Sequence, residues 1–181
     1  MKMVFLFFGI FLSQFNLRAQ QDGLPADKVM SEALQSASKQ NKHVILIFHA
    51  SWCGWCKRMD KLMNNDSCKS YFAKNYVVTH LDVDETDAKK NLENPGADAV
   101  RIKYGASKDQ GLPMWFILDK KGNLLDDSRY KSNIGKSKAG ENIGCPNSEQ
   151  EVTYFIDMLK KTSKLSVEDE SIIRNLFQEK K

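Results

Sequence analysis

Residues 52–57 read Trp52-Cys53-Gly54-Trp55-Cys56-Lys57, and the interpretation of the whole chain starts from this stretch. The apolar run before it, at residues 43–49, is bounded by polar residues and is typical of a buried strand. Residues 57–63 after it contain no Gly or Pro and space their apolar side chains at helical intervals. The pattern therefore predicts that Cys53 lies where a strand gives way to a helix, at the helix N-terminus.

Two cysteines on the first turn of a helix are close enough to form a disulfide. The unpaired N–H groups and the positive end of the helix dipole favour a thiolate at Cys53. A lowered thiol pKa makes Cys53 the attacking nucleophile. Cys56, one turn further in and expected to be less exposed, is placed to resolve a mixed disulfide.

Zinc binding and an inert disulfide are the alternatives for this pair. A structural zinc site normally takes four protein ligands, and the sequence has neither a second CxxC nor an HxxxH motif. We therefore expect no metal at this pair or elsewhere. The flanking Trp52 and Trp55 disfavour an inert disulfide, because they suit an exposed hydrophobic rim for a polypeptide substrate. We expect Trp52 to pack against its neighbours in the ordinary way and Trp55 to help dock the polypeptide substrate.

Over roughly residues 26–163 the chain resembles the thioredoxin-like superfamily. The resemblance rests on five landmarks in chain order: the active-site stretch 50–57, the third strand 77–84, the segments 94–96 and 103–105 before the substrate loop, Gly111-Leu112-Pro113 with the apolar strand 114–118, and Gly144 in the last loop. A CxxC motif followed by Gly-x-Pro and an apolar strand is a specific combination.

The resemblance implies an α/β fold with a central mixed β-sheet flanked by helices, followed by an extra C-terminal helix. It implies a thiol–disulfide oxidoreductase in which Cys53 and Cys56 are catalytic and no organic cofactor takes part. In the family the proline at Pro113 is cis and lies beside the sulfurs. Leu112 would offer its backbone to an extended substrate strand, with Trp55 as a further substrate contact.

The chain also departs from the family pattern. Gly54-Trp55 stands where thioredoxin has Gly-Pro, so the redox potential cannot be carried over. Ile47 stands where many thioredoxins have a buried acid, and His80 replaces a lysine of the third strand. His80 is predicted to lie beneath Cys56 as a candidate for proton transfer. Lys57 is a second candidate, or a solvated lysine of the first turn.

Periodicity and turn residues predict the remaining elements. Ser148 with Glu151 predicts a capping box at the start of a helix. Residues 131–147 are rich in Gly, Ser, Lys and Asn and are expected to form a surface loop. We expect further helices at residues 25–40, 67–74, 98–104 and 166–179, and further strands at 77–83 and 124–130.

The 181 residues favour one domain. Residues 1–19 are predicted to be a secretory signal, with Lys2, a short apolar run and Leu17-Arg18-Ala19 before cleavage. A buried strand or an uncleaved anchor is the alternative. Residues 20–165 would form the thioredoxin-like domain and residues 166–181 the C-terminal helix and tail. Export means a periplasmic location in a Gram-negative bacterium, or secretion otherwise, with no stable membrane span after cleavage.

Charge excludes a nucleic-acid-binding protein. The formal charge of +4 falls to +2 without Lys2 and Arg18, and the basic residues are interspersed with acids. Residues 57–61 are an example of the solvated charged surface that this pattern predicts.

Disulfides persist in an oxidising compartment, so the state of the two cysteines outside the CxxC pair matters as well. Cys68 and Cys145 are predicted to pair with each other, to remain free, or to form a second redox couple.

The expected partners are protein substrates with thiols or disulfides and a redox partner that recharges the CxxC pair. Two alternative functions remain open: a non-catalytic peptide-binding or chaperone-like module, and a disulfide isomerase that dimerises, for instance through the apolar side of the last helix.

Overall fold

The computed structural model describes residues 23–178, so the predicted signal segment at residues 1–19 lies outside the described residues. A four-stranded mixed sheet forms the centre, in the order β2-β1-β3-β4. β1 (His43–His49) pairs in parallel with β2 (Tyr76–Asp82) and antiparallel with β3 (Met114–Leu118). β4 (Leu124–Asp127) pairs antiparallel with β3.

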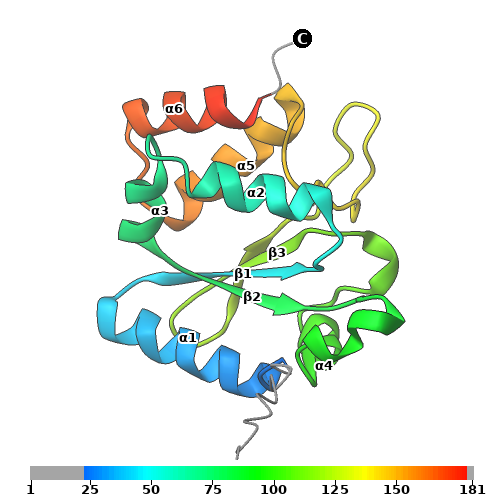
Figure 1. Ribbon diagram of the computed structural model, residues 1–181. Coiled ribbons are helices and arrows are strands. Elements are labelled where there is room, and N and C mark those ends of the chain that lie inside the picture. The colour runs from blue at the N-terminus through cyan, green and yellow to red at the C-terminus, as the bar shows by residue number, and fades with distance from the viewer. Residues whose placement is uncertain (1–22, 179–181) are drawn as a thin grey trace, which may run out of the picture.

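Helices cover both faces of the sheet (Figure 1). One face carries α2 (Gly54–Met63), α3 (Lys69–Asn75), α5 (Glu149–Thr162) and α6 (Val167–Phe177). The other face carries α1 (Ala26–Gln40) and α4 (Ala97–Lys103). Two short 3-10 turns, η1 (Asp87–Leu92) and η2 (Lys108–Gln110), flank α4 in sequence. The predicted α/β architecture with a C-terminal helix is confirmed.

The alternation of side chains along β1 divides the core into two layers. Ile45 and Ile47 pack toward α2 and α5, whereas Val44, Leu46 and Phe48 pack toward α1. All five side chains are buried, as are all five in β3. A run of consecutive apolar residues is what a strand covered on both faces requires.

The sequence located most elements closely. The strands at residues 43–49 and 114–118 have the predicted bounds, and the capping box of α5 forms between Ser148 and Glu151. β4 ends at Asp127 rather than at residue 130, because the chain turns at Asp127, whose side chain accepts hydrogen bonds from the residues that follow. Residues 131–147 were predicted to be a surface loop, which is wrong for its last third: Ile143 and Cys145 are buried in the core.

The apolar side of α6 packs back on the domain. Ile173 and Phe177 are fully buried, and the rings of Phe177 and Phe155 lie 5.1 Å apart. Ile172 and Leu176 pack against the same core at its margin. The predicted apolar side of this helix therefore belongs to the core of its own domain. Within residues 23–178, none of the helices combines the length and apolar character needed to cross a bilayer.

A buried carboxylate fixes the turn after β4. Asp127 Oδ1 accepts hydrogen bonds from Arg129 N at 2.8 Å and Nε at 3.1 Å, and Oδ2 lies 2.7 Å from Arg129 Nη2 and 2.8 Å from Lys131 Nζ. Arg129 also donates to the carbonyls of Tyr104 and Gly105. Burial would raise the pKa of Asp127, but the hydrogen bonds from Arg129 and Lys131 hold that pKa below its ordinary value of 3.8.

We predict that Asp127→Asn lowers the free energy of unfolding by about 2 kcal/mol at neutral pH, because hydrogen bonds to an ionised carboxylate are lost. A depressed pKa stabilises the fold above the unfolded-state value and stops doing so as pH falls through the folded value. The difference between wild type and variant should therefore shrink below about pH 4 in urea titrations. Asp66→Asn, at an exposed ion pair with Lys69, is the control and should change stability little. If the difference in unfolding free energy between wild type and Asp127→Asn did not depend on pH, the ionised carboxylate would not be its cause.

Candidate functional site

The cysteine pair lies where β1 leads into α2. Cys53 is the N-cap of α2, and its Sγ accepts a hydrogen bond of 3.1 Å from the backbone N–H of Cys56. The two residues form a disulfide with their Cα atoms 5.3 Å apart. Cys56 is the less exposed of the two, as expected, at 2% against 4% for Cys53, and both residues are buried. In this geometry the helix N-terminus directs its donors at the Cys53 sulfur.

Three distant parts of the chain meet at this pair. Ala50, directly after β1, and Leu112, in the loop before β3, complete an apolar cluster with Cys53 and Cys56. The peptide bond between Leu112 and Pro113 is cis. The sequence placed these residues in separate motifs, and the pairing of β1 with β3 brings the motifs together.

Both tryptophans flank the pair on the surface. Trp55 is 46% exposed, as a docking rim requires, and its ring lies 5.6 Å from the Arg58 guanidinium. Ordinary packing was predicted for Trp52, which is wrong: this residue is 54% exposed. Its indole N–H donates to the carbonyl of Asp84 at 2.8 Å, so the ring is held in place although it faces solvent.

Glu85 supports the turn before the cysteines, a role that the sequence did not indicate. This side chain is buried, and its carboxylate accepts from the backbone N–H of Ser51 and from the Ser51 hydroxyl, the latter at 2.8 Å. The contact joins residues 34 positions apart, so no local pattern could have revealed it.

Asn142 supports the loop on the other side of the pair. Its side-chain Nδ2 lies 3.0 Å from the carbonyl oxygen of Pro113, 3.1 Å from that of Gln110 and 3.3 Å from that of Gly111. A groove of about 310 Å³ runs beside this loop. Its lining includes Trp55, Leu112, Asn142 and Cys145. The predicted substrate-contact residues Trp55 and Leu112 thus line one groove.

Arg58 joins α2 to the C-terminal part of the chain. Its Nη1 donates to the Cys145 sulfur at 3.2 Å and to the Pro146 carbonyl at 3.1 Å, and its Nη2 donates to the Phe177 carbonyl at 2.9 Å. Residues 57–61 were predicted to be solvated surface, which is wrong for Arg58 and for Asp60. Both are half-buried, because α2 lies against the sheet on one side and against the 145–146 segment on the other.

Cys68 and Cys145 are both free and buried, so they form neither a bond with each other nor a second disulfide. Burial raises the pKa of the Cys68 thiol to about 11. Burial also raises the pKa of Cys145, an effect that the neighbouring Arg58 only partly offsets. Neither thiol is therefore set up to attack as a thiolate.

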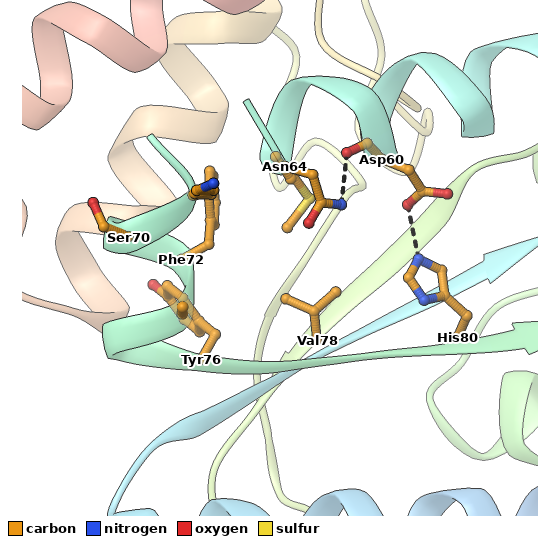
Figure 2. A pocket seen from close by; sticks show the side chains of 10 residues that line it. Asp60, Asn64, Ser70, Phe72, Tyr76, Val78 and His80 are labelled. Carbon is orange, nitrogen blue, oxygen red and sulfur yellow. Dashed lines mark hydrogen bonds and ion pairs between the residues drawn. The ribbon is translucent and has the colours of Figure 1, made fainter. Parts of the chain in front are cut away.

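His80 pairs with Asp60, a contact that the sequence did not predict. The His80 Nε2 lies 2.8 Å from the Asp60 Oδ1, as Figure 2 shows. Asp60 follows Cys56 by four residues and so lies one turn further along α2, a spacing that could have drawn attention to it. His80 is the register neighbour of Ile47 on the adjacent strand, and its side chain is hydrogen-bonded to Asp60. Its predicted position beneath Cys56 stays a prediction. Lys57 is exposed.

His49 lies beside His80, with ring centres 4.7 Å apart. Its Nε2 is 3.1 Å from the Asp82 Oδ1, an ion-pair distance. Burial opposes protonation of His49, but Asp82 and, at longer range, Asp60 outweigh it and raise the pKa of His49 above its ordinary 6.5. No role was predicted for His49.

Comparison with known proteins supports the arrangement. Residues 27–120, more than half of the chain, match the family described as Thioredoxin-like. No curated protein matches the chain.

Several solved structures are similar to this chain. A disulphide isomerase from Xylella fastidiosa Temecula1 is 21% identical with a TM-score of 0.46, over 63% of this chain and 77% of that one. A DsbH oxidoreductase is 18% identical with a TM-score of 0.45, over 84% and 94% of the two chains. The oxidised C-terminal domain of Neisseria meningitidis DsbD is 19% identical with a TM-score of 0.43, over 77% and 98%.

We predict that, once the disulfide is reduced, Cys53 is alkylated about ten times faster than Cys56 at mildly acidic pH, as a thiol pKa lower by one unit gives. Its position at the helix N-terminus stabilises the thiolate. Peptide mapping by mass spectrometry after timed labelling measures both rates. Cys68 and Cys145 are internal controls and should react slowest. Preferential labelling of Cys56 would reverse the assignment.

Proposed function

The chain belongs to the thioredoxin-like family, and from that premise we propose that it exchanges disulfides with exported protein substrates through its Cys53–Cys56 pair. The observation that carries the proposal is the Cys53–Cys56 disulfide at the N-terminus of α2, next to the Leu112–Pro113 loop and two exposed tryptophans. A disulfide that only stabilised the fold would need neither the Leu112–Pro113 loop nor the exposed tryptophans beside it.

In the reducing direction, the Cys53 thiolate attacks one sulfur of a substrate disulfide. The substrate S–S bond breaks, a Cys53–substrate disulfide forms, and one substrate thiolate leaves and takes a proton. Cys56 then attacks the Cys53 sulfur and releases the second substrate thiol. The substrate gains two electrons, and the protein is left with the Cys53–Cys56 disulfide that the structure contains. In the oxidising direction the same steps run backwards.

The direction of net transfer depends on the reduction potential of the pair and on the partner that recharges it. The cysteine sulfurs carry this chemistry themselves, so the mechanism uses no organic cofactor. Proton transfer by His80 or Lys57 stays a prediction. Export, which rests on residues 1–19, also stays a prediction, and with it the periplasmic or secreted location.

The substrate would lie in the groove beside the Leu112–Pro113 loop. Extended peptides bind by adding backbone hydrogen bonds to exposed strand-like segments, and the Leu112 backbone is the candidate here. The exposed ring of Trp55 lines the same groove and offers an apolar contact for a polypeptide side chain. Asn142 lines the groove as well and donates to the loop carbonyls, so it would act as a positioning residue.

We predict that the reduced protein accelerates insulin reduction by dithiothreitol, and that Cys53→Ser abolishes the acceleration. Cys68→Ala, which removes a buried free thiol, is the matched control and should keep the rate. Cys56→Ala should accumulate Cys53-linked mixed disulfides that mass spectrometry can identify. A protein that binds unfolded peptides but leaves insulin oxidised in every variant would be a non-catalytic module instead. Refolding of scrambled disulfides together with a dimeric solution mass would favour the isomerase.

We also predict that Asn142→Ala raises KM for a protein disulfide about five-fold, the equivalent of one hydrogen bond of roughly 1 kcal/mol. The alkylation rate of Cys53 should not change, because Asn142 contacts the loop and not the sulfur. Asn123→Ala makes the same substitution in the turn after β3, where the side chain bonds Asp119, and should leave KM unaltered. A fall in kcat with KM unchanged would contradict the positioning role.

A further inference from the structure

Three titratable side chains other than the cysteines converge beneath α2. His49 ends β1, His80 lies on β2, and Asp60 reaches down from α2. Each offers one ligand atom, and these atoms all lie within 4.8 Å of one another. All three side chains are half-buried.

Regular elements hold the three side chains. His49 pairs with Asp82 and His80 pairs with Ile47 in the parallel register of β1 and β2, so the histidines are diagonal neighbours on one face. The rings lie 4.7 Å apart. The Asp60–His80 contact of 2.8 Å fixes the helix side of the group (Figure 2). A site on strands and a helix is held more precisely than one on loops.

We propose that His49, Asp60 and His80 bind a divalent transition-metal ion, with zinc as the best match. Two imidazoles and one carboxylate form a donor set that suits zinc and its first-row neighbours. Calcium and magnesium prefer ligand sets made of oxygen atoms. Three protein ligands leave one coordination position for water or another exogenous ligand, as in open zinc sites.

The surroundings fit such an ion in two ways. Metal-bound histidines commonly present their other ring nitrogen to a carboxylate, and Asp82 Oδ1 lies 3.1 Å from the His49 Nε2. His49 would then bind the ion through Nδ1. A cavity of about 510 Å³ between α2, α3 and β2 is lined by Asp60 and His80 at one end. This cavity gives the ion a path from solvent and leaves room for the fourth ligand.

The test measures zinc binding directly, on the untagged full chain in its oxidised form. The Cys53–Cys56 disulfide keeps those two thiols from binding the ion. Isothermal titration with zinc alone, after removal of metal by a chelator, should give one site per chain. The visible spectrum of bound cobalt provides a second readout, sensitive to coordination by nitrogen and oxygen. The outcome does not depend on whether insulin is reduced, so failure of this proposal and of the redox function are distinguishable.

Four variants separate a metal site from a structural ion pair. His80→Ala and Asp60→Asn each remove a ligand and should weaken zinc binding by at least about 100-fold. Asp82→Asn removes only the outer partner of His49 and should weaken binding by about 10- to 100-fold. His43→Ala is the matched control, because this third histidine lies at the far end of β1, with its Nδ1 2.7 Å from the Thr162 carbonyl. His43→Ala should bind zinc as the wild type does.

Circular dichroism establishes that each variant is folded before binding is measured. No saturable zinc binding by the wild type would overturn the proposal. Zinc binding that persists unchanged in folded His80→Ala and Asp60→Asn would also overturn it, because the ion would then lie elsewhere.

Discussion

The burial of β1 on both faces is the constraint on which the rest of the structure depends. Five consecutive side chains, from Val44 to Phe48, have almost no exposure, and they alternate between two separate apolar layers. Because the strand cannot slip by one residue without exchanging its two faces, its end is fixed. The start of α2 and the position of Cys53 follow from that end. The antiparallel partner β3 then brings the Leu112–Pro113 loop against the cysteines.

Polar contacts on either side of this core hold the redox pair in place. Glu85 binds the turn that precedes Cys53, Asn142 binds the loop that precedes β3, and Arg58 ties α2 to the segment around Cys145. Each satisfies buried or half-buried backbone groups that would otherwise lose hydrogen bonds with water. These residues do not react. They hold the surface around Cys53, which is the surface that the proposed substrate would meet.

The four cysteines illustrate how location sets chemistry. Cys53 receives a backbone N–H at a helix N-terminus, whereas Cys68 and Cys145 lie among apolar side chains that raise their pKa values. Helix α2 also presents a second polar group, since Asp60 lies one turn beyond Cys56 and faces two histidines of the sheet. One helix thus carries the redox pair at its start and the candidate metal site at its middle.

The sequence by itself determined the elements and the redox pair, because their causes are local. The apolar run at residues 43–49 predicts its strand, and the helix that follows places Cys53 at an N-terminus. Only the tertiary structure decided three features of the site: the exposure of Trp52, the contact between Ser51 and Glu85, and the hydrogen bonds from Asn142 to the Pro113 loop. The tertiary structure also brought His49, Asp60 and His80 together, although Asp60 and His80 are 20 residues apart in the sequence. Arg58 reaches Cys145 across 87 positions. Such contacts depend on the angle and depth at which helices pack on the sheet, and that geometry arises from the whole core rather than from any neighbouring residues in the chain.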